Sequence, residues 1–443
     1  MRWRNLPGAL TVAGALVLLQ QQLLLHQPPR LLDLNMASAS TGPAALRSRF
    51  SRPLTTESLE RNSSLAPQLQ HRWLGDGRNL LLTLEPGQRL ETSLQLDLAG
   101  EDGQGLRLPT SRWHWDPRPR VLAVVNVQGG EQLQVRQHNG DWTAISPIWP
   151  EIPHVLPLGD GSGVAAASRL DNGQLQLWLI PLRQANLHPV GQQAPGKLAD
   201  PPQRLRRKPV LFAHLSTNRR GDLLIQSGRL EPGSRQSVLL PQTGRSQILP
   251  WPASGPIQLL PEGGAAVVPS PDGLHLEALP PLEPRRQTLP GSRDLSSFCP
   301  PGRALLLRHW PDFRRSLELV EPGLPPRQLW LGSEALLASA CSRQGEQIWA
   351  LLLLGQARPQ LRLLALNRNG QELGHRSLKG WELEPGTGLH WDGATRQLLA
   401  TLRPLSGGGE LPLPAQPVMI DGDSLTLQPL ELSVRQAHWL PAG

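Results

Sequence analysis

The pattern of apolar and polar positions repeats along most of the chain. In each unit a tight turn, rich in Gly, Asp, Asn or Pro, precedes a short apolar strand, and these residue types favour hairpin turns. In the clearest copy, the turn Gly75–Gly77 separates Trp73 from the apolar run Leu80–Leu84. The unit returns about every 40–50 residues, a period that predicts the blades of a β-propeller. The same kind of turn recurs beside Trp115, Leu158, Leu215, Leu260, Cys299, Cys341, Trp391 and Trp439.

The units contain two kinds of strand. The run that follows a turn is apolar throughout, as at Val164–Ala167, which is expected of a strand covered on both faces. Later strands alternate polar and apolar residues, as at Gln174–Leu179 and Gln360–Ala365, which fits a half-exposed outer strand. The pattern therefore predicts an all-β chain that forms a single propeller of about eight four-stranded blades, with seven as the alternative.

The turn motif resembles that of a known class of propeller. A Trp or other apolar residue, then Ser-Pro-Asp-Gly or a variant, then an apolar strand is similar to the blade motif of TolB-type, WD40-like propellers; the copies are Trp73–Gly77, Ser270–Gly273 and Trp439–Gly443. The resemblance implies a propeller over residues 66–443 and no catalytic residues, because such propellers carry unrelated functions. We expect the strand at Ser433–Leu440 to close the ring beside Asn79–Leu84, since closure removes exposed sheet edges.

The N-terminal segment differs from the repeats. Arg2 and Arg4 precede the apolar run Leu6–Leu25, which has about the ~20 residues needed to cross a bilayer. Residues 1–26 are therefore predicted to be a single-pass anchor with a cytoplasmic N-terminus and the propeller in the periplasm, or in another extracytoplasmic space. The alternative is a signal peptide whose removal would release the protein into the periplasm. Residues 27–65, rich in Pro, Ser and Arg, are predicted to form a disordered tether.

The charge balance adds one candidate surface. The chain has 44 basic and 36 acidic residues and a net charge of +8. The arginines are dispersed without an aromatic and basic stripe, which argues against nucleic-acid binding. One basic cluster stands out in the proline-rich loop 195–209, as a solvated loop or as a docking site for an acidic partner or lipid headgroups. Its members are Lys197, Arg204, Arg206, Arg207 and Lys208.

Four histidines share one place in the repeat, directly before its Trp or Leu. They are His114, His214, His390 and His438. Equivalent positions of a propeller converge on its axis, so a ring of imidazoles could bind a metal. The alternative is that they are inner-strand residues with hydrogen bonds between blades. Their spacing is much wider than that of a zinc signature, so we assign no metal and no cofactor.

Cys299 and Cys341 are the only cysteines, and they lie near the same point of consecutive units. Adjacent inner strands are close enough for a disulfide in an oxidising compartment. The alternative is a pair of buried thiols that act as small apolar residues.

Motifs of catalysis are missing from the sequence. It has no Gly-x-Ser-x-Gly, no phosphate-binding Gly loop and no Cys-x-x-Cys. We therefore expect a monomeric, membrane-tethered interaction scaffold for a protein or polymer. The alternative is a hydrolase or lyase that acts on a sugar or peptide in the propeller funnel. That enzyme would need two carboxylates, or a carboxylate and a His, at one end of the axis, whereas a lining of Leu, Ala and Arg would argue against it.

Overall fold

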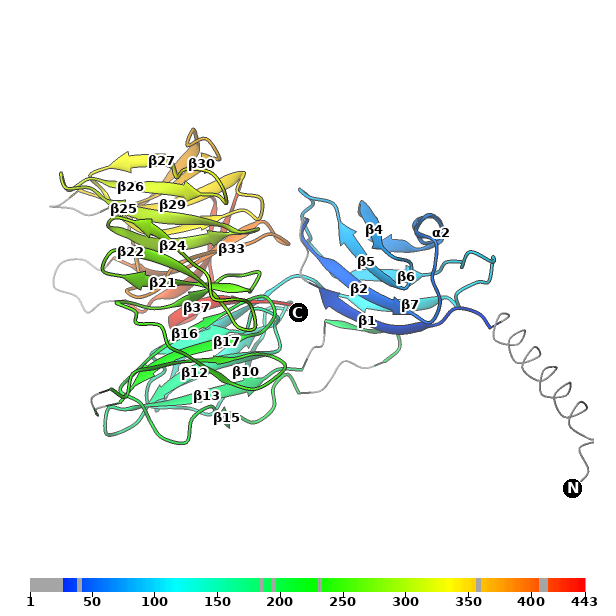
Figure 1. Ribbon diagram of the computed structural model, residues 1–443, viewed down its shortest axis with the longest axis horizontal. Helices are drawn as coiled ribbons and strands as arrows, with labels where there is room; N and C mark the ends of the chain where they lie inside the picture. The colour runs from blue at the N-terminus through cyan, green and yellow to red at the C-terminus, as the bar shows by residue number, and fades with distance from the viewer. Residues whose placement is uncertain are drawn as a thin grey trace, which may run out of the picture.

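The computed structural model describes residues 27–37, 42–183, 186–192, 197–229, 231, 233–355, 360–405 and 413–442. Within these ranges the chain is almost entirely β and forms two bodies, a smaller one built mainly from the N-terminal part and a larger β-propeller (Figure 1). The predicted anchor, residues 1–26, lies outside the described residues. In the described ranges, no helix has both the length and the apolar character to cross a membrane.

The smaller body is a sandwich of two four-stranded antiparallel sheets with one short helix, α2 (Thr56–Asn62). The two sheets share a core, in which Leu46 and Leu82 from one sheet and Leu96 from the other are fully buried. The first sheet has the order β1 (Leu31–Ala37), β2 (Ala45–Phe50), β5 (Asn79–Leu84), β4 (His71–Gly75), and the second β14 (Leu187–Pro189), β7 (Ser111–Trp115), β6 (Leu94–Leu98), β3 (Ser64–Ala66).

The prediction of a disordered tether over 27–65 is wrong for its described residues. They form β1, β2, α2 and β3. In β2 the side chains alternate between core and solvent, so Leu46 and Phe50 pack inward while Arg47 and Arg49 are exposed. The Pro, Ser and Arg content of this segment hid a short alternating strand, which needs few apolar residues to fill one face.

In the part of the chain that the structure describes, the remaining seven sheets follow one another along the chain and belong to the larger body. The first two have the orders β37 (Val434–Leu440), β8 (Arg120–Val127), β9 (Gly130–Arg136), β10 (Trp142–Ala144) and β11 (His154–Pro157), β12 (Gly163–Arg169), β13 (Leu175–Pro181), β15 (Gln203–Arg204). The next two are β16 (Phe212–Thr217), β17 (Leu223–Gly228), β18 (Gln236–Leu240), β19 (Gln247–Leu249) and β20 (Gln258–Leu259), β21 (Ala265–Ser270), β22 (Gly273–Ala278), β23 (Arg286–Pro290).

The last three sheets complete the set. The first has the order β24 (Arg293–Cys299), β25 (Arg303–His309), β26 (Arg315–Val320), β27 (Arg327–Gly332), and the second β28 (Ala335–Cys341), β29 (Gln347–Leu354), β30 (Gln360–Asn367), β31 (Glu372–Leu378). The third has the order β32 (Trp381–Leu383), β34 (Gln397–Pro404), β35 (Gln416–Asp421), β36 (Leu427–Pro429). In this last sheet β33 (Leu389–Asp392) also pairs with β34.

Contacts between neighbouring sheets run in a closed cycle. The strand β37 contacts β11, which contacts β16, which contacts β20; the sheet of β20 meets β24 through β22; and β24, β28, β33 and β37 contact in that order. The C-terminal strand β37 pairs with β8, with Val434 opposite Val125 and Leu440 opposite Arg120. The chain end therefore closes the ring, as expected, but beside Arg120–Val127 and not beside Asn79–Leu84, which pairs with β2 in the sandwich.

The propeller consequently starts near residue 120, and the predicted boundary at residue 66 is wrong. The turns at Trp73 and Trp115 belong to the sandwich: β4 and β5 form a hairpin there, and Trp115 ends β7. A tight turn followed by an apolar strand marks a hairpin in any well-covered antiparallel sheet, so this pattern could not distinguish the two bodies.

The sandwich lies against one mouth of the ring. The Leu90 amide donates to Ala394 O (2.8 Å), and Arg89 Nη1 lies 2.7 Å from Asp421 Oδ2. In a further contact between the two bodies, Asn186 Nδ2, just before β14 of the sandwich, donates to Ala442 O, just after β37 (2.8 Å). These contacts enclose the mouth between the two bodies.

Candidate functional site

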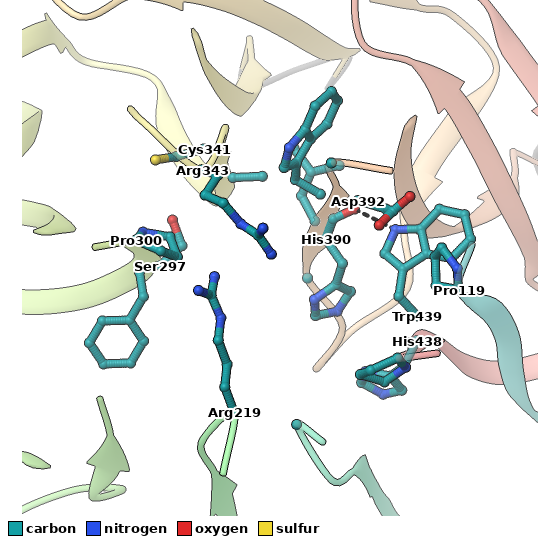
Figure 2. Close-up of a pocket in the computed structure, with 18 of the residues that line it drawn as sticks. Pro119, Arg219, Ser297, Pro300, Cys341, Arg343, His390, Asp392, His438 and Trp439 are labelled. Carbon is teal, nitrogen blue, oxygen red and sulfur yellow. Dashed lines mark hydrogen bonds between the residues drawn. The ribbon is translucent and has the colours of Figure 1, made fainter. Parts of the chain in front are cut away.

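A cavity of about 780 Å³ lies at this mouth, between the sandwich and the propeller. Its walls come from the strands β11, β20, β24, β28, β33 and β37, from turns beside them, from the turn after β16 and from the sandwich. The sandwich supplies small or apolar side chains, among them Met36, Ala44 and Trp115. We call this space the axial cavity; Figure 2 shows its polar lining.

Two arginines enter the axial cavity from equivalent hairpin turns. Arg219 follows Asn218, whose amide closes the β16–β17 turn on Asp222 O (3.3 Å), and Arg343 follows Ser342, whose amide closes the β28–β29 turn on Gln347 O (2.8 Å). Figure 2 shows the two guanidinium groups directed toward one another. Burial, together with the nearby positive charge of Arg219, lowers the pKa of Arg343 to about 10. Burial also lowers the pKa of Arg219, although Glu262 acts in the opposite direction.

Two of the predicted histidines also line the axial cavity. His390 on β33 and His438 on β37 have ring centroids 5.0 Å apart, tilted by 46°. Burial lowers the pKa of His390 to about 4, and burial with the neighbouring His390 lowers that of His438 to about 3. Both imidazoles are therefore neutral at pH 7. Trp439 holds the pair in place, because its Nε1 donates to His390 O (3.0 Å).

Asp392 is the carboxylate nearest to these histidines in sequence, two residues after His390 on β33. Its Oδ2 accepts hydrogen bonds from the amide and the hydroxyl of Thr395, both at 2.6 Å. Burial raises its pKa, and these hydrogen bonds oppose the shift. The cavity thus combines a carboxylate and imidazoles with an Arg-rich and apolar lining, so it has features of both functional alternatives.

The other two predicted histidines lie elsewhere. His114 on β7 of the sandwich stacks on His188, with ring centroids 4.9 Å apart. His214 on β16 lies 5.8 Å from the ring of Phe212 and is not part of the cavity lining. Of the four histidines that share the repeat position, only His390 and His438 therefore come together in the cavity. The copy with His114 belongs to the sandwich, and His214 lies on a propeller strand outside the cavity lining. Among the described residues, no group of three or more His, Cys, Asp or Glu could hold a metal ion.

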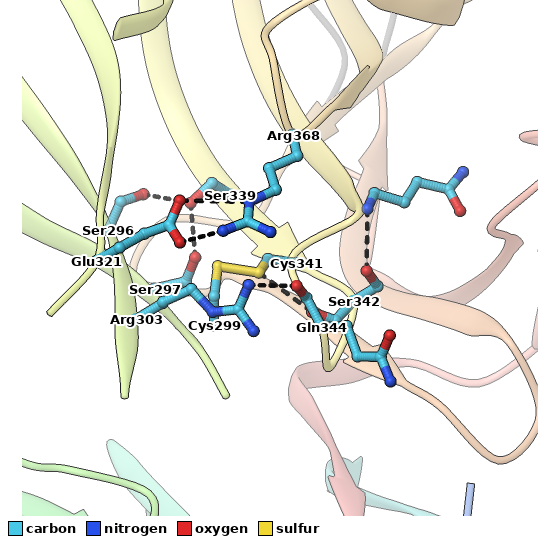
Figure 3. The surroundings of a disulfide bond; sticks show 11 residues. Ser296, Ser297, Cys299, Arg303, Glu321, Ser339, Cys341, Ser342, Gln344 and Arg368 are labelled. Atoms are coloured by element: carbon cyan, nitrogen blue, oxygen red, sulfur yellow. Dashed lines mark hydrogen bonds and ion pairs between the residues drawn. A yellow bond between two sulfur atoms is a disulfide. The ribbon is translucent and has the colours of Figure 1, made fainter. Parts of the chain in front are cut away.

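Cys299 and Cys341 are bonded to each other in the structure, with Cα atoms 5.5 Å apart. The bond joins the ends of β24 and β28 in adjacent sheets (Figure 3). Beside it, Ser339 Oγ lies 2.7 Å from Ser296 Oγ and 2.8 Å from Ser297 Oγ. Since Cys341 is two residues from Arg343, the disulfide also fixes the turn that carries a cavity arginine.

The basic loop lies away from the cavity, on the outer part of the sheet of β11–β13 and β15. Arg204 lies over Trp178, 5.5 Å from the ring centroid. Arg206, Arg207 and Lys208 line a smaller groove of about 260 Å³ together with Arg229. Burial lowers the pKa of Arg206, and Arg229 adds to the effect. Lys197 is exposed and does not line this groove.

Sequence reasoning missed Arg219, Arg343 and Asp392. The sequence does contain a signal for the two arginines. Arg219 and Arg343 each follow the first residue of the turn in their unit, so they occupy the same position of the repeat. That both guanidinium groups point inward depends on the turn conformation, which the repeat pattern does not reveal.

Comparisons with known proteins give structural likenesses only. No protein-family model matches the chain, and no curated protein matches it. Among solved structures, TolB from Acinetobacter baumannii has 11% identity over 80% of this chain and 81% of its own, with a TM-score of 0.40. The C-terminal WD40 domain of Sif2 has 14% identity over 70% and 81%, with a TM-score of 0.42.

An oligogalacturonate lyase in complex with manganese has 13% identity over 71% of this chain and 94% of its own, with a TM-score of 0.46. At such identities and TM-scores we draw no functional argument from these neighbours. They do include TolB and WD40 propellers, the class that the turn motif resembles.

Proposed function

We propose that this chain is a binding module in which a seven-bladed propeller, with the sandwich fixed over one mouth, holds part of a protein or polymer partner in the axial cavity. The observation that carries the proposal is the cavity itself, about 780 Å³ in volume and lined by residues of both bodies. Pockets of roughly 300–1,000 Å³ with an apolar lining and a few convergent polar groups are typical of ligand sites.

The seven blades of the proposal are the seven sheets of residues 120–440. The closed cycle of contacts between their strands supports this count, and so does the pairing of β37 with β8. A ring closed in this way leaves its two mouths as the natural binding surfaces.

A photo-crosslinking experiment tests the binding function. The photoreactive residue p-benzoylphenylalanine is placed at Leu337, which lines the cavity and is 39% exposed, or at Ile248, which is 67% exposed on β19. We expect a discrete crosslinked product in the native cell from position 337 and none from position 248. No product from position 337, or the same products from both positions, would contradict a cavity that binds a partner.

A second candidate is an extracytoplasmic hydrolase or lyase that acts on a sugar or peptide. The observation in its favour is Asp392 beside His390 and His438, since a carboxyl with a raised pKa near neutral imidazoles can supply an acid and a base. Turnover of an oligosaccharide or peptide by the purified chain, abolished by Asp392→Asn, would support it. The scaffold proposal expects no turnover.

The proposed location of the protein in the cell rests on its N-terminal sequence. Residues 6–25 would anchor a monomeric protein in the membrane, with the two β bodies in the periplasm, and no nucleic acid would bind. The groove at Arg206, Arg207 and Lys208 is a second docking surface in this proposal, for an acidic partner or lipid headgroups. Fractionation of cells tests the anchor: the chain should sediment with membranes, and a soluble chain that lacks residues 1–26 would contradict it.

A further inference from the structure

The axial cavity contains two positive charges that face each other. Arg219 comes from the sheet of β16–β19 and Arg343 from the sheet of β28–β31, with two sheets between them on that side of the ring. Figure 2 shows their guanidinium groups converging on a common space, with His390 at its side. We propose that Arg219 and Arg343 form a binding site for an oxyanion group, a carboxylate or a phosphate, on the ligand of the axial cavity. This assignment rests on the proposed binding function and names the chemistry of the ligand.

The protein itself uses few of the donors on these arginines. A guanidinium has five N–H donors in a planar fork that matches carboxylate and phosphate oxygens. Among the described residues, Arg343 Nη1 donates to Gly42 O of the sandwich (2.7 Å). Arg219 Nη1 lies 3.8 Å from Glu262 Oε1, beyond hydrogen-bond distance. Most donors of the pair are thus available to a ligand.

The carboxylates nearby do not occupy the space between the guanidinium groups. Both carboxylate oxygens of Glu262 are buried and have no hydrogen-bond partner among the described residues, so Glu262 only partly offsets the charge of Arg219. Asp392 accepts its hydrogen bonds from Thr395, and Figure 2 shows it beyond His390 from the arginines. His390 and His438 are neutral, and Glu262 and Asp392 offset part of the charge of the arginines. Among the described residues neither carboxylate forms a hydrogen bond with a guanidinium group, so the N–H donors remain available to an anion.

The backbone under both arginines is held rigidly, which lowers the cost of binding. In the Arg219 turn, Asn218 Nδ2 donates to Asp222 Oδ2 (2.7 Å), and Asn218 Oδ1 accepts from the Arg220 amide (2.9 Å). In the Arg343 turn, Ser342 Oγ accepts from the Gln347 amide (3.0 Å), and the disulfide at Cys341 anchors the strand before it. The two turns that carry the arginines are therefore ordered before a ligand arrives.

Calorimetric titration of the folded chain tests the site with two probes, inorganic phosphate and succinate, at constant ionic strength. The variants are Arg219→Gln and Arg343→Gln. The control is Arg220→Gln, which removes the same charge from the exposed neighbour in the same turn. We expect at least one probe to bind the original chain. We expect each cavity variant to weaken that binding at least tenfold and the control to change it less than twofold. Preference for phosphate or for succinate identifies the oxyanion.

The two cavity variants protect the test against a folding defect. Arg343→Gln loses the hydrogen bond to Gly42 O, whereas Arg219→Gln leaves the buried Glu262 carboxylate without its cation, so any loss of stability has a different cause in each variant, and the melting temperature of each is measured beside its affinity. Failure of both probes to bind, or equal binding to all variants, would overturn the oxyanion site. A crosslink from position 337 in that case would leave the binding function intact, so the two failures are distinguishable.

Discussion

At the scale of single residues, the neighbouring imidazoles of His390 and His438 couple stability to pH. Their pKa values fall from an ordinary 6.5 to about 4 and about 3 because burial disfavours the charged form. The unfolded chain therefore binds more protons than the folded chain between about pH 6.5 and pH 3. Stability that is fully present above pH 6.5 is lost as the pH falls through this window.

The expected result is a free energy of unfolding that drops by on the order of 3 kcal/mol per histidine between pH 7 and pH 4. Urea titration at several pH values measures it. His438→Gln should flatten the profile, while His375→Gln, at a site whose side chain is 53% exposed, should not. A steep profile that persists in His438→Gln would show that other groups cause it.

Gly422 is a second residue with a specific role, because it leaves room for the ring of Trp391. A Cβ at this position would overlap that ring, which stacks on Trp349 with centroids 4.3 Å apart. The carbonyl of Gly422 also accepts from Trp349 Nε1 (3.1 Å). We expect Gly422→Ala to destabilise the chain by about 1–3 kcal/mol, as overpacking does, measured by thermal or urea unfolding. An unchanged melting temperature would contradict this packing.

At the scale of elements, the disulfide joins two sheets that also share an apolar core, in which Leu317 of one sheet and Ile348 of the other are fully buried. Besides the serine cluster at Ser339, Arg303 donates to Gln344 O, and Arg368 pairs with Glu321 across the same boundary (Figure 3). The bond Cys299–Cys341 spans 42 residues. Closing a loop of that size restricts the unfolded chain and contributes roughly 4 kcal/mol in the chain-entropy account.

Replacing both cysteines by serine should therefore lower the free energy of unfolding by up to about 4 kcal/mol. Unfolding in urea, with and without a reductant, measures the change. The reductant should destabilise the original chain and leave the double variant unaffected. Equal stability of the oxidised and reduced chains would show that the bond adds little to this boundary.

The sequence predicted hairpins better than it predicted which body each hairpin joins. The alternation of turns and apolar runs located β8, β12, β17 and β34, because buried strands need apolar residues on both faces. It could not assign β5, since sandwich and propeller hairpins share the same local pattern. Of the cavity, it indicated His390 and His438 through their repeat position. It missed Arg219 and Arg343, because the direction of a long side chain on a turn depends on tertiary structure.

At the scale of the whole molecule, ring closure depends on the last strand. The strand β37 pairs with β8, and its Ala437 amide donates a hydrogen bond to Thr401 Oγ1 of β34 (3.0 Å). A chain that ends at residue 432 should therefore lose its cooperative unfolding and near-ultraviolet circular dichroism. A synthetic peptide of residues 433–443 should restore both, and a scrambled peptide should not. Native-like unfolding without the peptide would contradict closure by β37.

The central claim is that the axial cavity between the two bodies is the binding site of this molecule. Hydrogen–deuterium exchange of the whole chain, with and without the anion that binds more tightly, tests it directly. The account predicts slower exchange in the turns at 217–222 and 341–347, which carry Arg219 and Arg343, and no change at 204–208. Protection confined to the basic groove at 204–208, with the two turns unaffected, would contradict it.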